Sequence, residues 1–204
     1  MDEIVRRFSM LPATCVADGL RGFNALDCGI KPLKDGYTLC GRAMTVDMPA
    51  GDNAAVLKAI SQAQPGCVLV VDAKGYGGRA IAGEFVIGLA QKMGLAGVVV
   101  DGCIRDIMGI RSLDFPVFCK GSTPSASTKN GAGSVNVPIS CGGVTIRPGD
   151  IIVGDADGLV AVPQEREEDV LAAAEQKLVK DDARAAEYLK DEESARRYCA
   201  KLFS

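Results

Sequence analysis

Two charged residues, Arg105 and Asp106, stand side by side shortly after the apolar run at 98–100. The run consists of consecutive valines, and β-branched residues without alternation are typical of a strand buried on both faces. Asp101 and Gly102 favour a turn, so we expect the strand to end there. Because α/β proteins bind ligands beyond the carboxyl ends of such strands, Arg105 and Asp106 are candidate site residues.

Glu84 is a second acidic candidate, because it follows a glycine-rich segment, 74–83, near the expected start of a helix. The opening turn of a helix presents free backbone N–H groups and the positive end of the helix dipole, which attract a carboxylate or a phosphate. Residues 83–86 would form that turn. In the structural alternative, Glu84 is a helix N-terminal acid that only complements the dipole.

The two strand–helix junctions together suggest a hard cation and an oxo acid. Glu84 and Asp106 each supply a carboxylate, and Arg105 supplies a guanidinium; neighbouring strand ends would bring them into one crevice. Mg²⁺ binds through one or two carboxylates plus water, and a guanidinium can fork onto a carboxylate or an oxo group. The alternative is that these are solvated charges or local ion pairs, which contribute little stability.

Two further patterns allow other chemistry. Gly75, Gly77 and Ala80 form a G-x-G-x-x-A pattern that imitates the dinucleotide-binding fingerprint, although a flexible loop is the alternative. Lys120 ends the apolar run "PVFCK", as Schiff-base lysines do in barrel aldolases. The chain has too few strand–helix units for such a barrel, and a lysine at a strand end can simply steer anions.

Composition excludes several classes of site and partner. None of the 204 residues is histidine, so histidine triads, imidazole bases and histidine metal ligands are absent. The net charge of −3 predicts no nucleic-acid partner, and the N-terminus "MDEIVRRFSM" has no apolar run typical of a signal peptide or a membrane anchor. The eight cysteines are scattered, without a C-x-x-C motif, as in a reducing compartment. We therefore expect a cytoplasmic protein with no membrane partner.

The elements that must position these residues alternate between strand and helix in the first part of the chain. We expect strands at 37–48, 67–73, 97–101 and 115–120. We expect helices at 2–10, 14–20 (with Thr14 as a cap), 53–63 and about 84–93, and a short helix from the Arg-Asp segment to about residue 113. Residues 134–163 predict three or four short strands, and 164–204 a polar helical tail with scattered leucines. This order predicts a single α/β domain over residues 1–204 with a partly parallel sheet.

The sequence resembles a known family through four features in order. Gly83-Glu84 is followed, after 20 intervening residues, by Arg105-Asp106, then by "DFPVF" at 114–118 and "GGVTIRPGDIIVGDADGLVAVP" at 142–163. Together they resemble the class II pyruvate aldolases, the 4-hydroxy-4-methyl-2-oxoglutarate / 4-carboxy-4-hydroxy-2-oxoadipate aldolases, whose fold is shared by the RraA-type regulators of ribonuclease E. The resemblance covers roughly residues 10–165. It implies an RraA-like swivelling β/β/α domain with a C-terminal helical tail, assembled as a homotrimer or a homohexamer with the tail at a subunit interface.

The resemblance also implies roles for single residues. Asp106 would be the direct ligand of a divalent metal, Mg²⁺ or Mn²⁺, and Arg105 would bind a small 2-oxo acid. The backbone amides that would hold the carboxylate of that acid are those of Gly83, Glu84, Phe85 and Val86. Glu84 matches a position at which some relatives have an aspartate that contacts metal-bound water.

A further acid is implied to come from the C-terminal region of a neighbouring chain. The candidates in this sequence are Glu165, Glu167, Glu168 and Asp181.

The activity implied is that of a carbon–carbon lyase. It would cleave a 4-hydroxy-2-oxo acid by a retro-aldol reaction to pyruvate and a second carbonyl compound, with oxaloacetate decarboxylation as a side activity. The alternative is a non-catalytic regulator of the RraA type that acts by binding proteins. Such regulators tend to lose the aspartate of the Arg-Asp pair, whereas this chain keeps Asp106. A dinucleotide or methyl-donor enzyme that uses the Gly75 segment is a third possibility.

Overall fold

Four parallel strands form the centre of the fold. They are β2 (Leu39–Asp47), β3 (Val68–Ala80), β4 (Gly97–Ile104) and β5 (Val117–Ser122). The structure is a computed structural model that describes residues 2–131 and 133–203. Strands lie in the order β5-β4-β3-β2, so the carboxyl ends of β3 and β4 are neighbours. The partly parallel sheet expected from the sequence is confirmed.

Antiparallel strands extend this sheet on both sides. β1 (Lys31–Pro32) pairs with β5, β6 (Ser134–Val135) and β9 (Ile151–Asp155) pair with β2, and β10 (Gly158–Val162) pairs with β9. β7 (Ile139–Cys141) and β8 (Val144–Ile146) form a separate hairpin. Residues 134–163 thus form five short strands, where the sequence predicted three or four.

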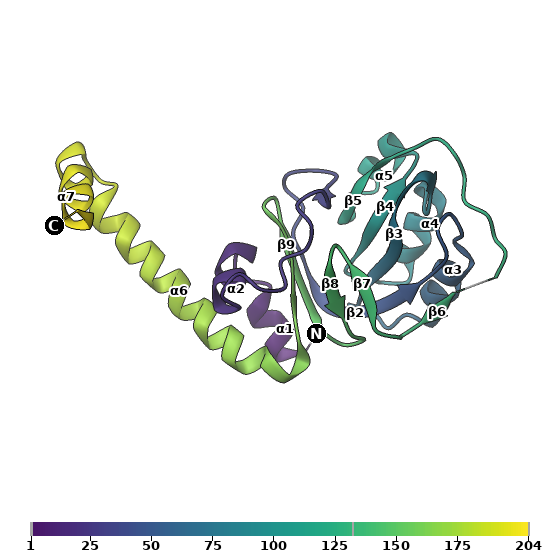
Figure 1. Cartoon of the computed structure of the whole chain (residues 1–204), viewed down its shortest axis with the longest axis horizontal. Helices are drawn as coiled ribbons and strands as arrows, with labels where there is room; N and C mark the ends of the chain where they lie inside the picture. Colours follow the sequence, from purple (N-terminus) through teal and green to yellow (C-terminus); the bar gives the residue numbers. More distant parts are fainter. Residues whose placement is uncertain (1, 132, 204) are drawn as a thin grey trace.

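Both faces of the central sheet are buried, which explains the unbroken apolar runs. Leu69 and Val71 pack with the helices α3 (Ala54–Gln62), α4 (Glu84–Lys92) and α5 (Ile107–Ser112). Val68 and Val70 point to the opposite face and pack beneath the β7–β8 hairpin (Figure 1). Successive residues of a strand alternate between faces, so a strand covered on both sides needs apolar residues throughout.

A third apolar cluster joins the two ends of the chain. The helices α1 (Glu3–Phe8) and α2 (Ala13–Gly19) pack with β9, β10 and the first half of α6 (Glu167–Tyr188), which follows the short helix η1 (Gln164–Arg166). α2 begins at Ala13 after Pro12, and the Asp155 carboxylate accepts the Ala13 N–H at 2.8 Å, so the expected cap at Thr14 is wrong.

The rest of α6 and the terminal helix α7 (Glu192–Leu202) project from the body as an arm (Figure 1). Val179, Leu189 and Leu202 on this arm are exposed. No helix among the described residues has the length and apolar character needed to cross a membrane.

Two strands run further than the sequence predicted. β4 continues through Asp101 and Gly102 to Ile104, so these two residues are not a turn. Gly102 is there for close packing, because a Cβ on it would lie 2.8 Å from the Cβ of Ala73 in β3. β3 likewise continues through the glycine-rich segment to Ala80. Because β4 extends to Ile104, Arg105 directly follows the end of this strand.

Candidate functional site

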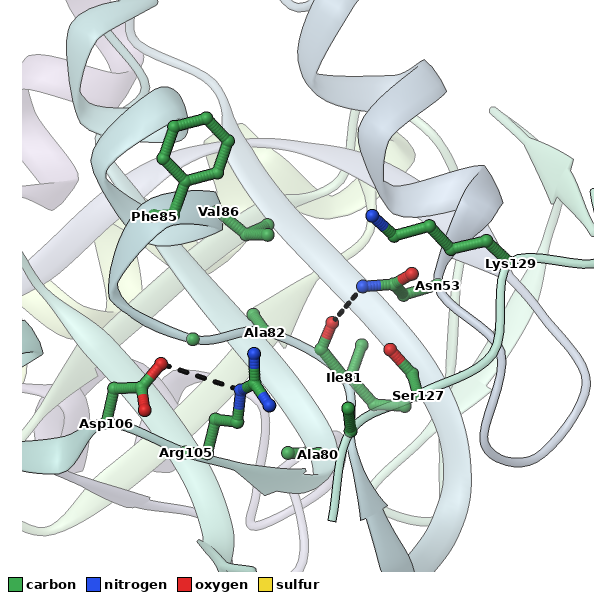
Figure 2. A pocket seen from close by; sticks show the side chains of 12 residues that line it. Asn53, Ala80, Ile81, Ala82, Phe85, Val86, Arg105, Asp106, Ser127 and Lys129 are labelled. Carbon is green, nitrogen blue, oxygen red and sulfur yellow. Dashed lines mark hydrogen bonds and ion pairs between the residues drawn. The ribbon is translucent and has the colours of Figure 1, made fainter. Parts of the chain in front are cut away.

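A cavity of about 230 Å³ lies at the carboxyl ends of β3 and β4 (Figure 2). Three parts of the chain line it: residues 80–83 with Phe85 and Val86 at the start of α4, the β4–α5 junction with Arg105 and Asp106, and a wall formed by Asn53, Ala126, Ser127 and Lys129. This is the edge of a parallel sheet at which α/β proteins bind ligands. The structure therefore brings both predicted junctions to one cavity.

Asp106 turns the chain from β4 into α5. Its backbone is left-handed (φ 59°, ψ 42°), a conformation that Asp and Asn tolerate better than most residues, and its side chain does not cap the helix. Instead the carboxylate accepts the backbone N–H of Glu84 at 3.3 Å and lies 3.5 Å from Nε of Arg105. The side chains of Arg105 and Asp106 are 43% and 47% exposed, so both can meet a ligand.

Gly83 allows the two junctions to touch. It caps α4 with an extended backbone, and a Cβ built on it would overlap Oδ2 of Asp106 and lie 3.2 Å from both Cγ and Nε of Arg105. Any side chain at this position would displace the Arg-Asp pair. Glycine is thus needed for close approach, not for an unusual backbone angle.

The first turn of α4 borders the cavity. The first hydrogen bond of this helix runs from the Ile87 N–H to the Gly83 carbonyl at 3.0 Å. The N–H groups of Phe85 and Val86 precede it, and both residues line the cavity. Together with the helix dipole they can hold an anion. The Glu84 N–H is directed to Asp106 instead.

The Glu84 carboxylate lies beside the cavity and does not line it. Its Oε2 occupies the space that a Cβ of Gly109 in α5 would fill, and Glu84 is absent from the cavity lining. The structure therefore brings together Gly83, Phe85, Val86, Arg105 and Asp106, and it holds the Glu84 carboxylate over α5. The role of Glu84 stays a prediction.

Sequence reasoning missed the opposite wall. Asn53 lines the cavity with only 5% of its surface exposed, and its Nδ2 donates to the Ile81 carbonyl at 3.0 Å. Its Oδ1 is buried and has no hydrogen-bond partner within residues 2–131 and 133–203. Ser127 and Lys129 complete this wall. They come from a polar stretch without periodicity, so only their tertiary contacts identify them.

Lys120 lies outside the cavity lining. Its ammonium pairs with Asp101 at 2.7 Å and with Asp27 at 3.0 Å, and the hydrogen bond to Asp101 raises the pKa of Lys120 above its usual value. A protonated lysine is a poor nucleophile, which argues against a Schiff base.

The glycine pattern at 75–80 lies within β3 rather than in a turn that opens a helix, so it lacks the geometry of a dinucleotide site.

The candidate C-terminal acids do not reach the cavity lining of their own chain. Glu167 is buried and binds Arg42 at 2.6 Å, whereas Asp181 pairs with Lys177 and Arg184 on the arm. Glu165 and Glu168 lie at the start of the tail, in η1 and α6. Within the chain as described, there is no group of three or more Asp, Glu or Cys that could hold a metal.

Comparisons with known proteins identify relatives of this chain. A family profile described as "RraA-like: Aldolase/RraA" matches residues 13–161. A protein of Halalkalibacterium halodurans named "Putative 4-hydroxy-4-methyl-2-oxoglutarate aldolase" is 50% identical over 200 residues, which cover 98% of this chain and 95% of that protein.

Two solved structures share the fold. RraAS2 of Streptomyces coelicolor, described as an unusual member of the RNase ES inhibitor RraA protein family, matches with a TM-score of 0.79 and 30% identity over 90% of this chain and 96% of its own. The RNA-processing inhibitor RraA of Thermus thermophilus matches with a TM-score of 0.69 and 33% identity over 74% of this chain and 92% of its own. On the profile match and the 50% identity, this chain belongs to the RraA-like family of aldolases and RraA proteins, as its motifs predicted.

Proposed function

We propose that this protein is a metal-dependent aldolase that cleaves a 4-hydroxy-2-oxo acid to pyruvate and a second carbonyl compound. The observation that carries the proposal is the convergence of Asp106, Arg105 and the first turn of α4 on one cavity. The name of the 50% identical relative supports the same reaction class.

Asp106 would hold the divalent metal, Mg²⁺ or Mn²⁺. It is a half-exposed carboxylate, and its contacts with Arg105 and the Glu84 N–H leave oxygen lone pairs free. A single carboxylate fits a hard cation that takes its other ligands from water and substrate. When bound, the metal would polarise the 2-oxo group and favour negative charge on its oxygen.

Arg105 would bind the oxo acid and stabilise the charge that develops on it. Cleavage of the C3–C4 bond leaves the electron pair on the pyruvate part as an enolate. The planar guanidinium of Arg105 can fork onto the enolate oxygen and the neighbouring carboxylate. The N–H groups of Phe85 and Val86 would hold the same carboxylate, which fixes the orientation of the substrate.

The C4 hydroxyl must lose a proton as the bond breaks, and the chain has no histidine to accept it. We assign to Glu84, whose carboxylate lies over α5, the role of holding a water that takes this proton and returns it to C3 of the enolate, which gives pyruvate. On this assignment, Glu84→Gln reduces turnover by about 10- to 100-fold and leaves metal binding intact. Decarboxylation of oxaloacetate gives the same enolate, so this side activity is expected.

The decisive experiment measures pyruvate release from a panel of 4-hydroxy-2-oxo acids and from oxaloacetate, with Mg²⁺ or Mn²⁺ and with EDTA. We expect release that EDTA abolishes and that added metal restores. Release that EDTA leaves unchanged would contradict the metal dependence, and no release from any acid would contradict the aldolase.

A protein-binding regulator is the second candidate, and the likeness to two RraA structures favours it. If the protein is such a regulator, Asp106 and Arg105 need not act together, and its surface would bind the partner protein. Absence of pyruvate release, combined with inhibition of a ribonuclease E-type enzyme by the purified protein, would establish it in place of the aldolase.

We further propose that the protein assembles as a homotrimer or a dimer of trimers. The arm formed by the end of α6 and α7 exposes Val179, Leu189 and Leu202, which an isolated chain leaves in water. An acid of the tail would then reach a neighbouring active site. Light scattering that finds a monomer at micromolar concentration would refute the shared site.

A further inference from the structure

Gly109 lies in α5 at the point that the side chain of Glu84 reaches from α4. A Cβ built on Gly109 would overlap Oε2 and Cδ of Glu84 and lie 3.0 Å from its Cγ. Apart from neighbouring residues of α5, the three atoms nearest to that Cβ all belong to Glu84. The glutamate side chain therefore rests on the bare backbone of this glycine.

The place of Gly109 inside a helix points to packing as the reason for a glycine. It is the third residue of α5, and its backbone does not lie in the left-handed region that favours glycine. Glycine inside a helix costs stability relative to alanine, because it loses more conformational freedom on folding. A glycine that the backbone does not require is explained by the close approach of another group. Here that group is the side chain of Glu84.

The two strand–helix junctions exchange an acid for a glycine. The carboxylate of Asp106, at the start of α5, fills the space over Gly83 at the cap of α4. The carboxylate of Glu84, in α4, fills the space over Gly109 in α5. Both helices pack on the same face of the central sheet, which holds the junctions side by side. Each acid is thus located by the absence of a side chain on the opposite junction.

Only packing fixes the position of the Glu84 carboxylate. The residue is exposed, and within residues 2–131 and 133–203 its carboxylate makes no hydrogen bond or ion pair. Asp106, by contrast, contacts both Arg105 and the Glu84 N–H. The lone pairs of the Glu84 carboxylate are therefore free to accept hydrogen bonds from water, and the place where they do so depends on the surface beneath the side chain.

We propose that Gly109 is a positioning residue for Glu84. It lets the carboxylate lie where the carboxylate holds the water that takes the proton of the C4 hydroxyl and returns it to C3. Alanine at this position would displace the carboxylate by overlap, and an exposed side chain can turn into water when it is displaced. This inference rests on the proposed function for the role of the water.

Exchange of the methyl protons of pyruvate with D₂O tests the inference without an aldol substrate. Pyruvate is incubated with the protein and Mg²⁺, and the methyl signal is followed by NMR. The water that protonates the enolate at C3 also removes a C3 proton in the reverse direction, so Gly109→Ala should slow exchange about 10- to 100-fold. Exchange in this variant within about twofold of the wild type, or no exchange by the wild type, would overturn the inference.

Pyruvate affinity separates positioning of the water from damage to the binding site. The Cβ of Gly109→Ala would meet Glu84 and none of the residues that line the cavity. We therefore expect the calorimetric Kd for pyruvate with Mg²⁺ to change by less than about twofold while exchange falls. A loss of affinity as large as the loss of exchange would overturn the positioning role.

A double-mutant cycle shows whether Gly109 acts through Glu84. In Glu84→Ala the atoms that overlap with the new Cβ are gone, so adding Gly109→Ala should not slow exchange further. The same loss in both backgrounds would mean that Gly109→Ala acts by another route, and the assignment would fail.

Gly88→Ala is the matched control, because Gly88 lies in α4 and a Cβ there meets only Leu113 Cδ1, at 4.0 Å. Alanine favours both helices, so the urea midpoint should not fall in either variant, and exchange should be lost only in Gly109→Ala. An equal loss of exchange in Gly88→Ala would refute the positioning role. A fall in the midpoint of Gly109→Ala that persists when Glu84→Ala is added would do so as well.

Pyruvate release separates this inference from the proposed function. From a 4-hydroxy-2-oxo acid that the wild type cleaves, Gly109→Ala should lower kcat about 10- to 100-fold and leave KM nearly unchanged. If the wild type releases no pyruvate but exchanges methyl protons in a manner that depends on Gly109, the aldolase proposal fails and Gly109 keeps its role. If the wild type and Gly109→Ala cleave and exchange at equal rates, the positioning role fails and the aldolase stands.

Discussion

Replacing Gly83 by alanine tests the contact between the two strand–helix junctions. The backbone of Gly83 (φ −125°, ψ −173°) is extended and suits alanine, so the substitution causes no backbone strain. The methyl group of the introduced alanine would overlap Oδ2 of Asp106 and lie 3.2 Å from Cγ and Nε of Arg105. The overlap is therefore confined to the two side chains to which we assign metal and substrate binding.

The expected loss of activity in Gly83→Ala follows from how far the Asp106 carboxylate must move. Restoring a carbon–oxygen contact of about 3.3 Å requires a shift of about 1 Å, which also breaks the bond from the Glu84 N–H. Metal–ligand distances tolerate about 0.2 Å, and a misplacement of about 1 Å in an active site can lower the rate about 100-fold. Since Asp106 and Arg105 are 47% and 43% exposed, both can swing into water, and the free energy of unfolding should change by no more than about 1 kcal/mol.

The assay compares kcat/KM for pyruvate release with stability from urea unfolding. Gly88→Ala is the control, because Gly88 lies in the same helix and a Cβ there meets only Leu113 Cδ1, at 4.0 Å. We expect it to keep activity and to gain up to about 1 kcal/mol from helix propensity. Activity of Gly83→Ala within twofold of the wild type would refute the role given to the Gly83–Asp106 contact.

Asp106→Asn should keep the fold, because asparagine also tolerates the left-handed backbone, and should lower pyruvate release at least about 100-fold together with metal affinity measured by calorimetry. Arg105→Lys keeps the charge but not the fork, so kcat/KM should fall while metal affinity stays; unchanged kinetics in either variant would refute its assigned role. Lys120→Ala should keep metal-dependent turnover, and borohydride added with pyruvate should leave the wild-type mass unchanged; a reduced pyruvyl adduct would contradict this. The ion pair with Asp101 raises the pKa of Lys120, so the pair stabilises the fold fully below the usual lysine pKa and loses this contribution as pH rises through the raised value. The difference in the free energy of unfolding between wild type and Lys120→Ala, measured in urea, should therefore shrink in that pH range. The lowered pKa of Asp52 has the opposite sign: Asp52→Asn should lose about 1–3 kcal/mol at pH 7, and the difference from wild type should vanish as pH falls through the lowered value; a difference independent of pH would contradict it.

The sequence alone determined the parts of this protein that depend on local pattern. The valines at 98–100 predicted a doubly buried strand, and β4 confirms it, because periodicity reports how many faces are covered. The ordered motifs predicted the family, which the profile match confirms. The absence of histidine limited the chemistry to carboxylates, arginine, lysine, cysteine, tyrosine, backbone amides or a metal. These inferences need only neighbouring residues or their order.

Local reasoning failed where distant segments decide the conformation. Asp101 and Gly102 favour a turn by type, yet they continue β4, because Gly102 packs against Ala73 and the carboxylate of Asp101 is bound by Lys120 and the Gly142 N–H. The energy of these long-range contacts outweighs the weak turn preference of two residues.

Only the tertiary structure decided the composition of the site. Gly83 and Asp106 are far apart in sequence and touch because β3 and β4 are parallel neighbours whose carboxyl ends coincide. The opposite wall of the cavity contains Asn53 and Lys129. Hydrogen bonds between residues 51–54 and 128–130 hold its two segments together, and no periodicity in the sequence predicts these bonds. The same packing holds the Glu84 carboxylate over α5 and pairs Lys120 with acids outside the cavity. Residue type fixes which chemistry is available, whereas the direction of each side chain depends on packing between elements that the sequence does not place side by side.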